Sequence, residues 1–258
     1  MRISSNQLNS ESLKIISLVP SQSELLWDLG IREELIGITK FCIHPDEMFR
    51  SVTRIGGTKN LNIDLIRELK PDLIIANEEE NEKSQIEILQ KEFNVHVTEI
   101  YTLDDSYKMI ESIGKMVGKK ARALELIAEI QTAFFSLSKP LRPKKVLYLI
   151  WNDPFMAAGK NTIIDDLLMH AGFENCLHMG RYPVLSLKEI EALEPELIFL
   201  SSEPFPFSEK HFELFKSLAK AKPMIVDGEM FSWYGSRVKS APAYFKTLRE
   251  AIEQPQYR

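Results

Sequence analysis

The sequence predicts an α/β protein with two lobes, each built on a parallel sheet, which are joined by a long helix. Short apolar runs alternate with helical patterns over residues 14–103 and again over 139–258, and a helical stretch over 104–138 separates them. Such alternation is typical of βαβ units, in which helices link parallel strands. We therefore predict an N-terminal lobe, a connecting helix and a C-terminal lobe with these bounds.

The first lobe shows strand and helix signals in alternation. Apolar runs rich in β-branched residues lie at 14–19, 35–39, 72–76 and 94–100. The helix after the first run is expected to end at Gly30, and the helix before the third run at Pro71, because these residues interrupt a helical pattern. Ligands of such sheets bind at the carboxyl ends of the strands, so the residues that follow these runs are the candidates for a site.

The connecting stretch repeats its apolar residues at helical spacing from about Asp104 to Phe135. One helix or two would fit this pattern, since Gly114 and Gly118 each weaken a helix by roughly 1 kcal/mol relative to alanine. We favour one unbroken helix, which the prolines at 140 and 143 would end.

The second lobe repeats the first. The segment 62–75 matches 186–199 in the type of five residues, among them the pair Pro71 and Pro195, and 24–31 resembles 166–173. Two similar lobes explain this economically. The alternative is that helix–proline–strand units look alike in any α/β protein.

Composition excludes several classes of function. The net charge of −5 and the absence of a Lys/Arg-rich run argue against nucleic acid as a partner. No stretch approaches 18 apolar residues, so no membrane span is expected. The two cysteines, Cys42 and Cys176, are too few for a disulfide framework and are expected to be free, packed thiols.

The sequence also lacks the motifs of common catalytic sites. It contains no P-loop, no GxGxxG after a strand, no GxSxG and no HExxH, and its five histidines have no metal-ligand spacing. We therefore predict a protein that is not an enzyme, with no catalytic residues and no directly bound metal ion. The first 14 residues contain no export signal, which predicts a cytoplasmic chain as it stands, or a periplasmic or membrane-associated one if an export signal was trimmed.

Polar and aromatic residues, among them Glu78 to Glu80 and Glu203, follow the predicted strands. The candidates for ligand binding are Ser21, Phe41, His44, Thr58, Lys59, Trp151, Phe155, Arg181, Tyr182, Phe205, Trp233, Tyr234 and Arg237. Aromatic faces suit a broad, flat macrocycle better than a sugar or an amino acid. Each aromatic could instead belong to the core, Arg237 could form a surface salt bridge, and Ser21 and Ser23 are better explained as helix caps.

Three segments carry a family resemblance. The segments 16–30, 54–77 and 227–237 resemble, in this order, stretches of the cobalamin-binding branch of the helical-backbone ABC-transporter solute-binding proteins, a family whose members carry cobalamin, haem or ferric siderophores. The resemblance covers about 14–251. It implies two Rossmann-like lobes bridged by one rigid helix, with a ligand held between them.

The sequence departs from this family at several positions. The resemblance implies an acidic residue on each lobe for docking to the permease, and these positions are Asp64 and Lys188. The charge is reversed at Lys188, where the adjacent Glu189 could substitute. A first-lobe aromatic over the ligand is replaced near Thr58. Cys42 and His44 could instead offer ligands to a chelated metal, or form a structural loop.

These observations predict a monomeric binding protein that captures cobalamin or another corrinoid for an ABC importer, without a covalent cofactor. Two alternatives remain open. One is a haem or ferric-siderophore binder, and the other is a cytoplasmic corrinoid-handling enzyme or chaperone on the same fold.

Overall fold

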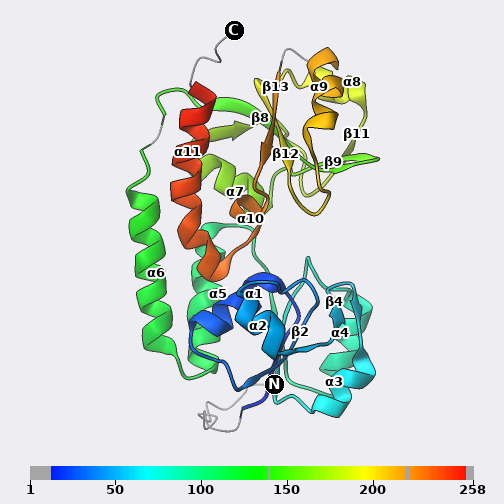
Figure 1. Ribbon diagram of the computed structural model, residues 1–258, viewed down its shortest axis with the longest axis vertical. Coiled ribbons are helices and arrows are strands. Elements are labelled where there is room, and N and C mark those ends of the chain that lie inside the picture. Colours follow the sequence, from blue (N-terminus) through cyan, green and yellow to red (C-terminus); the bar gives the residue numbers. More distant parts are fainter. Residues whose placement is uncertain (1–12, 139, 219–220, 254–258) are drawn as a thin grey trace. The chain divides into compact units, whose positions relative to one another are not determined.

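The computed structural model describes residues 13–138, 140–218 and 221–253. This part of the chain divides into two compact units, whose elements are labelled in Figure 1. Unit 1 holds residues 13–100, Asp104–Ile130 and Tyr234–Arg237, whereas unit 2 holds Tyr101–Leu103, Gln131–Trp233 and 238–253. The segment Tyr234–Arg237 therefore belongs to the same unit as the N-terminal residues. The sequence predicted two contiguous lobes and did not indicate this exchange.

Unit 1 is built on a five-stranded sheet in which every pairing is parallel, in the order β3-β2-β1-β6-β7. Its strands are β1 (Ile15–Ser17), β2 (Leu35–Ile38), β3 (Thr53–Arg54), β6 (Leu73–Asn77) and β7 (Val95–Thr98), and a separate hairpin pairs β4 (Gly56–Gly57) with β5 (Asn60–Leu61). Its first four helices are α1 (Pro20–Asp28), α2 (Asp46–Ser51), α3 (Ile63–Leu69) and α4 (Lys83–Gln90). Ile16, Ile66, Ile74 and Leu89 pack in its core.

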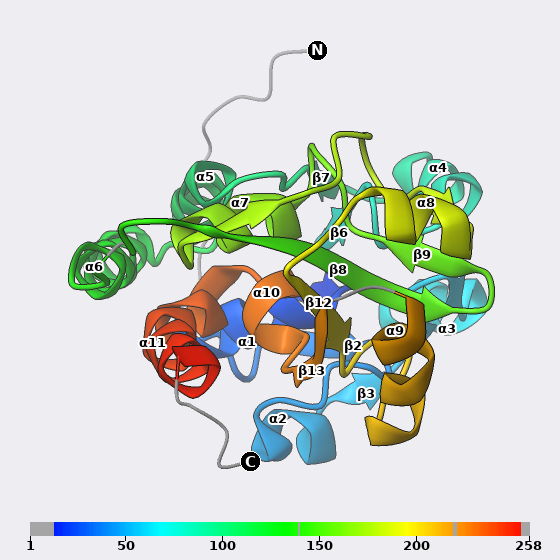
Figure 2. The ribbon, with the colours of Figure 1, turned by 90° about the horizontal axis from the view of Figure 1, so that it is seen from above.

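Unit 2 is built on a second sheet, whose central strands are parallel. Its strands are β8 (Lys144–Asn152), β9 (Phe155–Ala157), β10 (Phe173–Asn175), β11 (Val184–Leu185), β12 (Leu197–Ser201) and β13 (Lys222–Val226). Its helices are α7 (Ile163–His170), α8 (Leu187–Ala192), α9 (Phe212–Leu218), α10 (Glu229–Ser232) and α11 (Ala241–Glu253), with a 3-10 turn at η1 (Glu209–His211). A second 3-10 turn, η2 (Gly235–Ser240), begins in unit 1 and ends in unit 2. Figure 2 shows β8 crossing this unit beside β12 and β13.

The α/β class with two parallel sheets is confirmed, with one correction. Strands β10, β8, β12 and β13 pair in parallel, but β9 and β11 are antiparallel to their neighbours. The antiparallel edge arises because β8 turns back into β9 after only Asp153 and Pro154, and a connection this short can join only antiparallel strands.

The internal repeat is confirmed by matching elements. Both repeated segments form a short helix followed by a buried strand, α3 then β6 and α8 then β12. Each helix begins with a side-chain cap, from Asn62 or Ser186, and each is followed by a left-handed residue directly before proline, Lys70 or Glu194. The lobes therefore share details of backbone conformation that helix–proline–strand units in general do not require.

The second pair of similar segments also matches. Helices α1 and α7 each end before a glycine in the left-handed region, Gly30 at φ 82° and Gly172 at φ 84°. Glycine adopts this conformation without the steric cost that a side chain would add, and it is the common residue after a helix. The strand that follows each glycine, β2 or β10, pairs in parallel with the first strand of its unit.

The stretch predicted as one unbroken helix is two helices, α5 (Leu103–Met116) and α6 (Lys120–Phe135). The break lies at Gly118, which has φ 72° and ends α5. Gly114 has a different role, because a Cβ there would lie 2.3 Å from the Cβ of Ala123, so its missing side chain lets α5 and α6 approach closely. The long helix that runs from one unit into the other is α6, since the division falls between Ile130 and Gln131.

Replacing Gly114 by alanine is expected to lower the free energy of unfolding by about 1–3 kcal/mol, because the new methyl group would overlap that of Ala123. Chemical denaturation would measure this loss. Adding Ala123→Gly to Gly114→Ala removes the overlap and should recover part of the stability, although glycine in a helix costs about 1 kcal/mol relative to alanine. A double variant less stable than Gly114→Ala would contradict this explanation.

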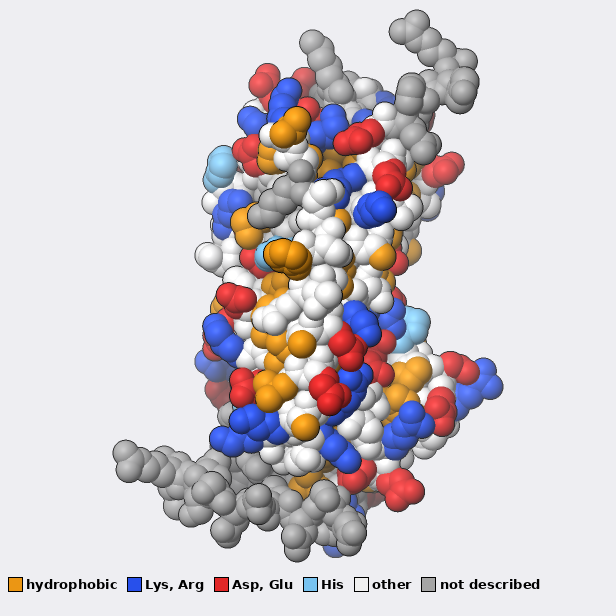
Figure 3. Space-filling view, turned by 90° about the vertical axis from the view of Figure 1, so that its left-hand side faces the viewer, with side chains coloured by type: hydrophobic (Ala, Val, Ile, Leu, Met, Phe, Trp, Pro, Cys, Tyr) orange, Lys and Arg blue, Asp and Glu red, His pale blue; other side chains and the backbone are white. Residues whose placement is uncertain are grey.

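The surface of α6 is mixed in character. Figure 3, in which the side that carries α6 faces the viewer, shows hydrophobic side chains flanked by acidic and basic ones. Arg122 pairs with Glu125 and Glu129 on this helix, while Leu124 and Phe135 are exposed. Among the residues that the structure describes, no helix combines the length and apolar character that crossing a membrane requires.

Candidate functional site

The candidate residues lie where parallel strands end. In unit 1, Phe41 and His44 come after β2, and Glu80 comes after β6. In unit 2, Trp151 lies at the end of β8 and Phe205 follows β12. Because parallel strands direct their carboxyl ends to the same edge, each sheet gathers its own candidates at one edge, where ligands of such sheets bind.

A buried amide network supports the edge of unit 1. The Asn77 amide donates to the carbonyl of Thr98 at 3.2 Å, and the Asn81 amide donates to the carbonyls of Leu18 at 3.2 Å and Thr58 at 3.1 Å. Asn77 and Asn81 are 2% and 3% exposed. Since buried polar side chains are costly unless they are hydrogen-bonded, these residues fix the loops that follow β1, β4 and β6.

Ser21 and Tyr234 are brought together in unit 1. The hydroxyl of Ser21 accepts a hydrogen bond from the backbone N–H of Tyr234 at 3.3 Å, and the Tyr234 hydroxyl donates to Glu80 at 2.8 Å. Tyr234 is buried, so its ring serves mainly as a link between its segment and the strand-end loops. The candidate residues therefore include groups that hold the site together.

The expectation that Ser21 and Ser23 cap a helix is wrong. Helix α1 begins at Pro20, its N-cap is Val19, and no side chain caps it. Proline at the first position explains this, since its fixed φ suits the helix start and it has no N–H to satisfy. The hydroxyl of Ser23 instead donates to the carbonyl of Val19 at 2.9 Å inside the first turn.

Phe41, Thr58 and Lys59 lie close together in unit 1. Thr58 and Lys59 form the turn of the β4–β5 hairpin, and the Lys59 ammonium donates to the carbonyl of Glu79 at 2.7 Å. A Cβ on Gly57 would lie 3.2 Å from the ring of Phe41, which is 50% exposed. Phe41 thus offers an exposed aromatic beside Thr58, the position where the family aromatic is missing.

Arg237 is engaged within unit 1. Its guanidinium makes two hydrogen bonds of 2.8 Å to the carboxylate of Glu24, and the side chains are 16% and 14% exposed. Burial raises the pKa of Glu24, an effect that the hydrogen bonds from Arg237 oppose. This bidentate pair matches the salt-bridge alternative, although it is largely buried, and ligand binding by Arg237 stays a prediction.

Cys42 and His44 differ in exposure in the loop after β2, and ligation of a chelated metal by either of them stays a prediction. Cys42 is fully buried, and its sulfur lies 3.1 Å from the hydroxyl of Ser23 and 3.2 Å from that of Thr39, whereas His44 is half-buried. Burial raises the pKa of the Cys42 thiol to about 11, which keeps it protonated, and metals bind the thiolate. Across the described residues, no group of three or more His, Cys, Asp or Glu side chains could hold a metal ion.

Both cysteines are expected to resist thiol reagents in the folded protein at pH 8. Cys42 and Cys176 are 0% and 6% exposed, and burial raises the pKa of each to about 11. Labelling with a chromogenic disulfide should be slow in buffer and complete for both thiols in denaturant. Rapid labelling of one thiol in buffer would show that it is more accessible than the structure indicates.

An aromatic group lies at the edge of unit 2. The rings of Trp151 and Phe205 meet edge to face at 5.6 Å, and Trp151 is 40% exposed. Phe155 instead packs against Phe215, 5.7 Å away. Phe231, which precedes the candidates Trp233 and Tyr234 in the sequence, is fully buried. Trp151 and Phe205 are thus the accessible aromatic pair of this edge.

Trp233 is held by an acidic residue. Its indole N–H donates to Glu203 at 2.8 Å, and the hydroxyl of Ser232 donates to the same carboxylate oxygen at 2.8 Å. Burial raises the pKa of Glu203, and these two hydrogen bonds act in the opposite direction. Trp233 is only 7% exposed, so this bond anchors the loop that carries Phe205 to the segment after β13.

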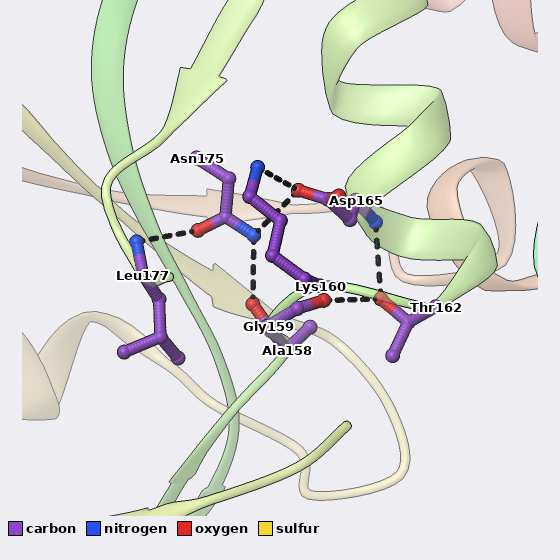
Figure 4. Close-up of polar contacts among 7 residues, drawn as sticks. All are labelled: Ala158, Gly159, Lys160, Thr162, Asp165, Asn175 and Leu177. Atoms are coloured by element: carbon purple, nitrogen blue, oxygen red, sulfur yellow. Dashed lines mark hydrogen bonds and ion pairs between the residues drawn. The ribbon is translucent and has the colours of Figure 1, made fainter. Parts of the chain in front are cut away.

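A second polar cluster, the Lys160 network, lies in unit 2 and consists of Lys160, Thr162, Asp165 and Asn175 (Figure 4). Asp165 accepts hydrogen bonds from the Lys160 ammonium at 2.9 Å and from the Asn175 amide at 3.0 Å. Thr162 caps helix α7, because its hydroxyl accepts a hydrogen bond from the N–H of Asp165. The network fixes the loop that precedes α7.

Arg181 and Tyr182 lie in the loop before β11. Arg181 has φ 63°, and its guanidinium lies 5.3 Å from the centre of the Tyr101 ring. Both Arg181 and Tyr101 belong to unit 2. A non-glycine residue at positive φ is uncommon and persists only where the surrounding structure enforces it. The backbone conformation of Arg181 is therefore held by its contacts with neighbouring segments.

The predicted docking residues differ in their surroundings. Asp64 is 87% exposed at the second residue of α3 and pairs with Arg67 at 2.9 Å. Glu189 closes a capping box on α8, where its carboxylate accepts hydrogen bonds from the N–H and hydroxyl of Ser186 at 2.7 Å. Lys188 stands at the position equivalent to Asp64. Glu189, the residue expected to substitute for it, has a carboxylate that is already engaged in capping α8.

The family model described as periplasmic binding protein matches residues 15–222. The chain belongs to the periplasmic binding protein family. Among curated relatives of this periplasmic binding protein, the uncharacterized ABC transporter substrate-binding lipoprotein YvrC of Bacillus subtilis is 30% identical over 173 residues, which are 62% of this chain and 54% of the relative. The vitamin B12-binding protein of Vibrio cholerae is 24% identical over 198 residues, or 73% of this chain and 70% of the relative.

Solved structures share the fold of this periplasmic binding protein. The periplasmic heme-binding protein RhuT from Roseiflexus sp. RS-1 matches with a TM-score of 0.82 and 21% identity, covering 94% of this chain and 100% of RhuT. The vitamin B12 binding protein BtuF of Vibrio cholerae matches with a TM-score of 0.75 and 21% identity, covering 93% of this chain and 98% of BtuF. Both confirm the fold, and their names include two different kinds of chelate.

Several supporting residues were missed by the sequence analysis. Asn77, Asn81 and Thr98 are buried polar residues at or just after the ends of β6 and β7, and Asn175 ends β10. A polar side chain at the end of an otherwise apolar strand was the available signal. Glu203 stood among the candidates, but nothing in the sequence indicated its bond to Trp233, which lies 30 residues away.

Proposed function

We propose that this periplasmic binding protein captures a metal chelate, with a corrinoid as the first choice, and delivers it to an ABC permease. The observation that supports this most is the exposed aromatic residue at the carboxyl edge of each sheet, Phe41 in unit 1 and Trp151 in unit 2, together with the buried Asn77 and Asn81 network at the edge of unit 1. Flat aromatic surfaces at a preorganised edge suit a broad, largely apolar macrocycle.

The names of the relatives support the same class of ligand. One relative is a vitamin B12-binding protein and another is a substrate-binding lipoprotein of an ABC transporter, and both are binding proteins. By analogy we propose that this chain is a monomer without catalytic activity or covalent cofactor, that it acts outside the cytoplasmic membrane, and that Asp64 contributes to docking on the permease.

Titration with cobalamin, cobinamide, haemin and a ferric siderophore tests the proposal. Tryptophan quenching should follow binding, because Trp151 is partly exposed at the proposed site, and calorimetry would confirm it. The control is Trp151→Phe, which keeps an aromatic ring and should bind while losing most of the quenching. Binding of cobalamin or cobinamide alone supports the corrinoid, and absence of binding to all four chelates overturns the proposal.

Haem is the second candidate, because one of the structures that share the fold is a heme-binding protein. Preferential binding of haemin in the same titration would favour it. In that case an absorption band typical of iron ligated by a side chain would direct attention to His44 or a tyrosine near the strand ends.

A further inference from the structure

We propose that Lys160 and Asp165 are positioning residues for Arg181, which meets an anionic oxygen of the ligand. This inference rests on the proposed function, because it names the chemistry that one part of the same site recognises. All the residues involved lie in unit 2.

The Lys160 network first fixes the loop at residues 158–162. The amide nitrogen of Asn175 donates to the carbonyl of Ala158 at 3.0 Å as well as to Asp165, and the hydroxyl of Thr162 donates to the carbonyl of Gly159 at 2.8 Å (Figure 4). The ammonium of Lys160 forms an ion pair with Asp165, whose side chain is 19% exposed. Main chain and side chain of the loop are thus tied to helix α7 and to the end of β10.

The same loop holds the segment that carries Arg181. The N–H of Lys160 donates to the carbonyl of Met179 at 2.8 Å, and its carbonyl accepts from the N–H of Arg181 at 2.7 Å. The N–H of Gly159 donates to the carbonyl of Arg181 at 2.8 Å. Met179 is 53% exposed and Arg181 is exposed, so backbone hydrogen bonds to the loop hold this segment more than side-chain burial does.

These hydrogen bonds hold the backbone of Arg181 in an unfavourable conformation. Its φ of 63° costs on the order of 1 kcal/mol for a residue with a side chain, and the three hydrogen bonds from the loop maintain it. In this conformation the guanidinium lies over Tyr101. An arginine whose backbone is held in place is suited to a carboxylate or a phosphate, since the planar donors of its guanidinium match both.

The probes differ in the group that Arg181 would recognise. Cobalamin carries a phosphodiester and haemin carries carboxylates, whereas cobinamide lacks the phosphodiester. We expect Lys160→Met and Asp165→Asn each to weaken the binding of an anionic ligand, cobalamin or haemin, by about tenfold. The reason is that Arg181, no longer held in place, would lose its charge-assisted hydrogen bond to the ligand. Binding of cobinamide should change by less than about twofold, since Arg181 has no anionic oxygen to meet there.

Asp165→Asn separates positioning from direct contact. If the Lys160 ammonium itself bound the anion, removal of the neighbouring carboxylate charge would strengthen binding, whereas loss of positioning weakens it. Lys160→Arg can keep the ion pair and should restore affinity. Lys210→Met, the same charge change at an exposed residue of η1, is the matched control.

Hydrogen exchange gives a readout without ligand. Peptides that contain 179–181 should exchange faster in Lys160→Met and Asp165→Asn than in the wild type or Lys210→Met. Unchanged exchange, or equal affinity of variants and wild type for cobalamin and haemin, overturns the inference while the proposed function stands. If the wild type binds no chelate, the proposed function fails, and the role of Arg181 fails with it.

Discussion

Replacing Arg237 by methionine is expected to lower the free energy of unfolding by about 3–5 kcal/mol, because it leaves the carboxylate of Glu24 buried without its cation. The pair is largely buried and bidentate, with two hydrogen bonds of 2.8 Å, so this loss should far exceed that of an exposed ion pair. Urea denaturation at pH 7 would measure it.

The pH dependence of this loss has a defined sign. Burial raises the pKa of Glu24 above its usual value in the wild type, although the hydrogen bonds from Arg237 oppose this effect. Without Arg237, the pKa of Glu24 should be higher in the variant than in the wild type. A carboxyl group with a raised pKa in the folded state contributes stability below its unfolded pKa, and that contribution disappears as the pH rises through the folded pKa. The deficit of Arg237→Met relative to the wild type should therefore be small near about pH 4 and largest above neutrality. Asp28 and His44 also act on Glu24, but they are present in both proteins.

A paired substitution is the control. Glu24→Leu combined with Arg237→Met replaces both charges by apolar groups and should regain most of the stability. If this double variant is stable and still binds the chelate as the wild type does, Arg237 is not a ligand contact. A stable double variant with weak binding would support the sequence-based prediction that it is one.

Replacing Gly159 by alanine is expected to cost about 3 kcal/mol or more. A Cβ there would lie 2.0 Å from the carbonyl oxygen of Met179 and 3.3 Å from that of Arg181, and both are backbone atoms that no side-chain rotation can move. The two loops would have to separate, and the hydrogen bond from Gly159 to Arg181 would break. Thermal denaturation would measure the effect, and ligand affinity should fall with it.

Gly180 provides the matched control for this prediction. It lies in the facing loop, but a Cβ there would meet only the Asn161 amide and the carbonyl of Lys160, each at 3.8 Å, which is ordinary contact. Gly180→Ala should therefore be nearly neutral. Equal losses for the two variants would show that glycine flexibility, and not the close approach of the loops, explains the result.

Sequence reasoning predicted the parts of the fold that depend on local patterns. The strands at β1, β6 and β7, the helix end at Gly30 and the break at Pro71 all follow from apolar runs and from residues that interrupt helices. The repeat was also visible, because equivalent positions must bury similar side chains.

The rest depends on contacts distant in sequence. The preference for an unbroken helix failed because Gly118 takes a left-handed conformation, which the apolar spacing does not report. The aromatic candidates could not be sorted into accessible and buried ones, since burial of Trp233 depends on Glu203, 30 residues earlier. Arg237 was recognised as a candidate, but its partner Glu24 lies 213 residues away.

The return of Tyr234–Arg237 to unit 1 affects how the chain can be made. A ribosome releases the N-terminal residues first, yet Arg237, the buried partner of Glu24, and Tyr234, whose hydroxyl donates to Glu80, are synthesised only after most of unit 2. Unit 1 therefore lacks an internal charge pair while most of unit 2 is already available to fold. Unit 1 should therefore reach its final packing only after residues 234–237 have been synthesised, and a fragment that stops after α6 would leave the carboxylate of Glu24 without its Arg237 partner.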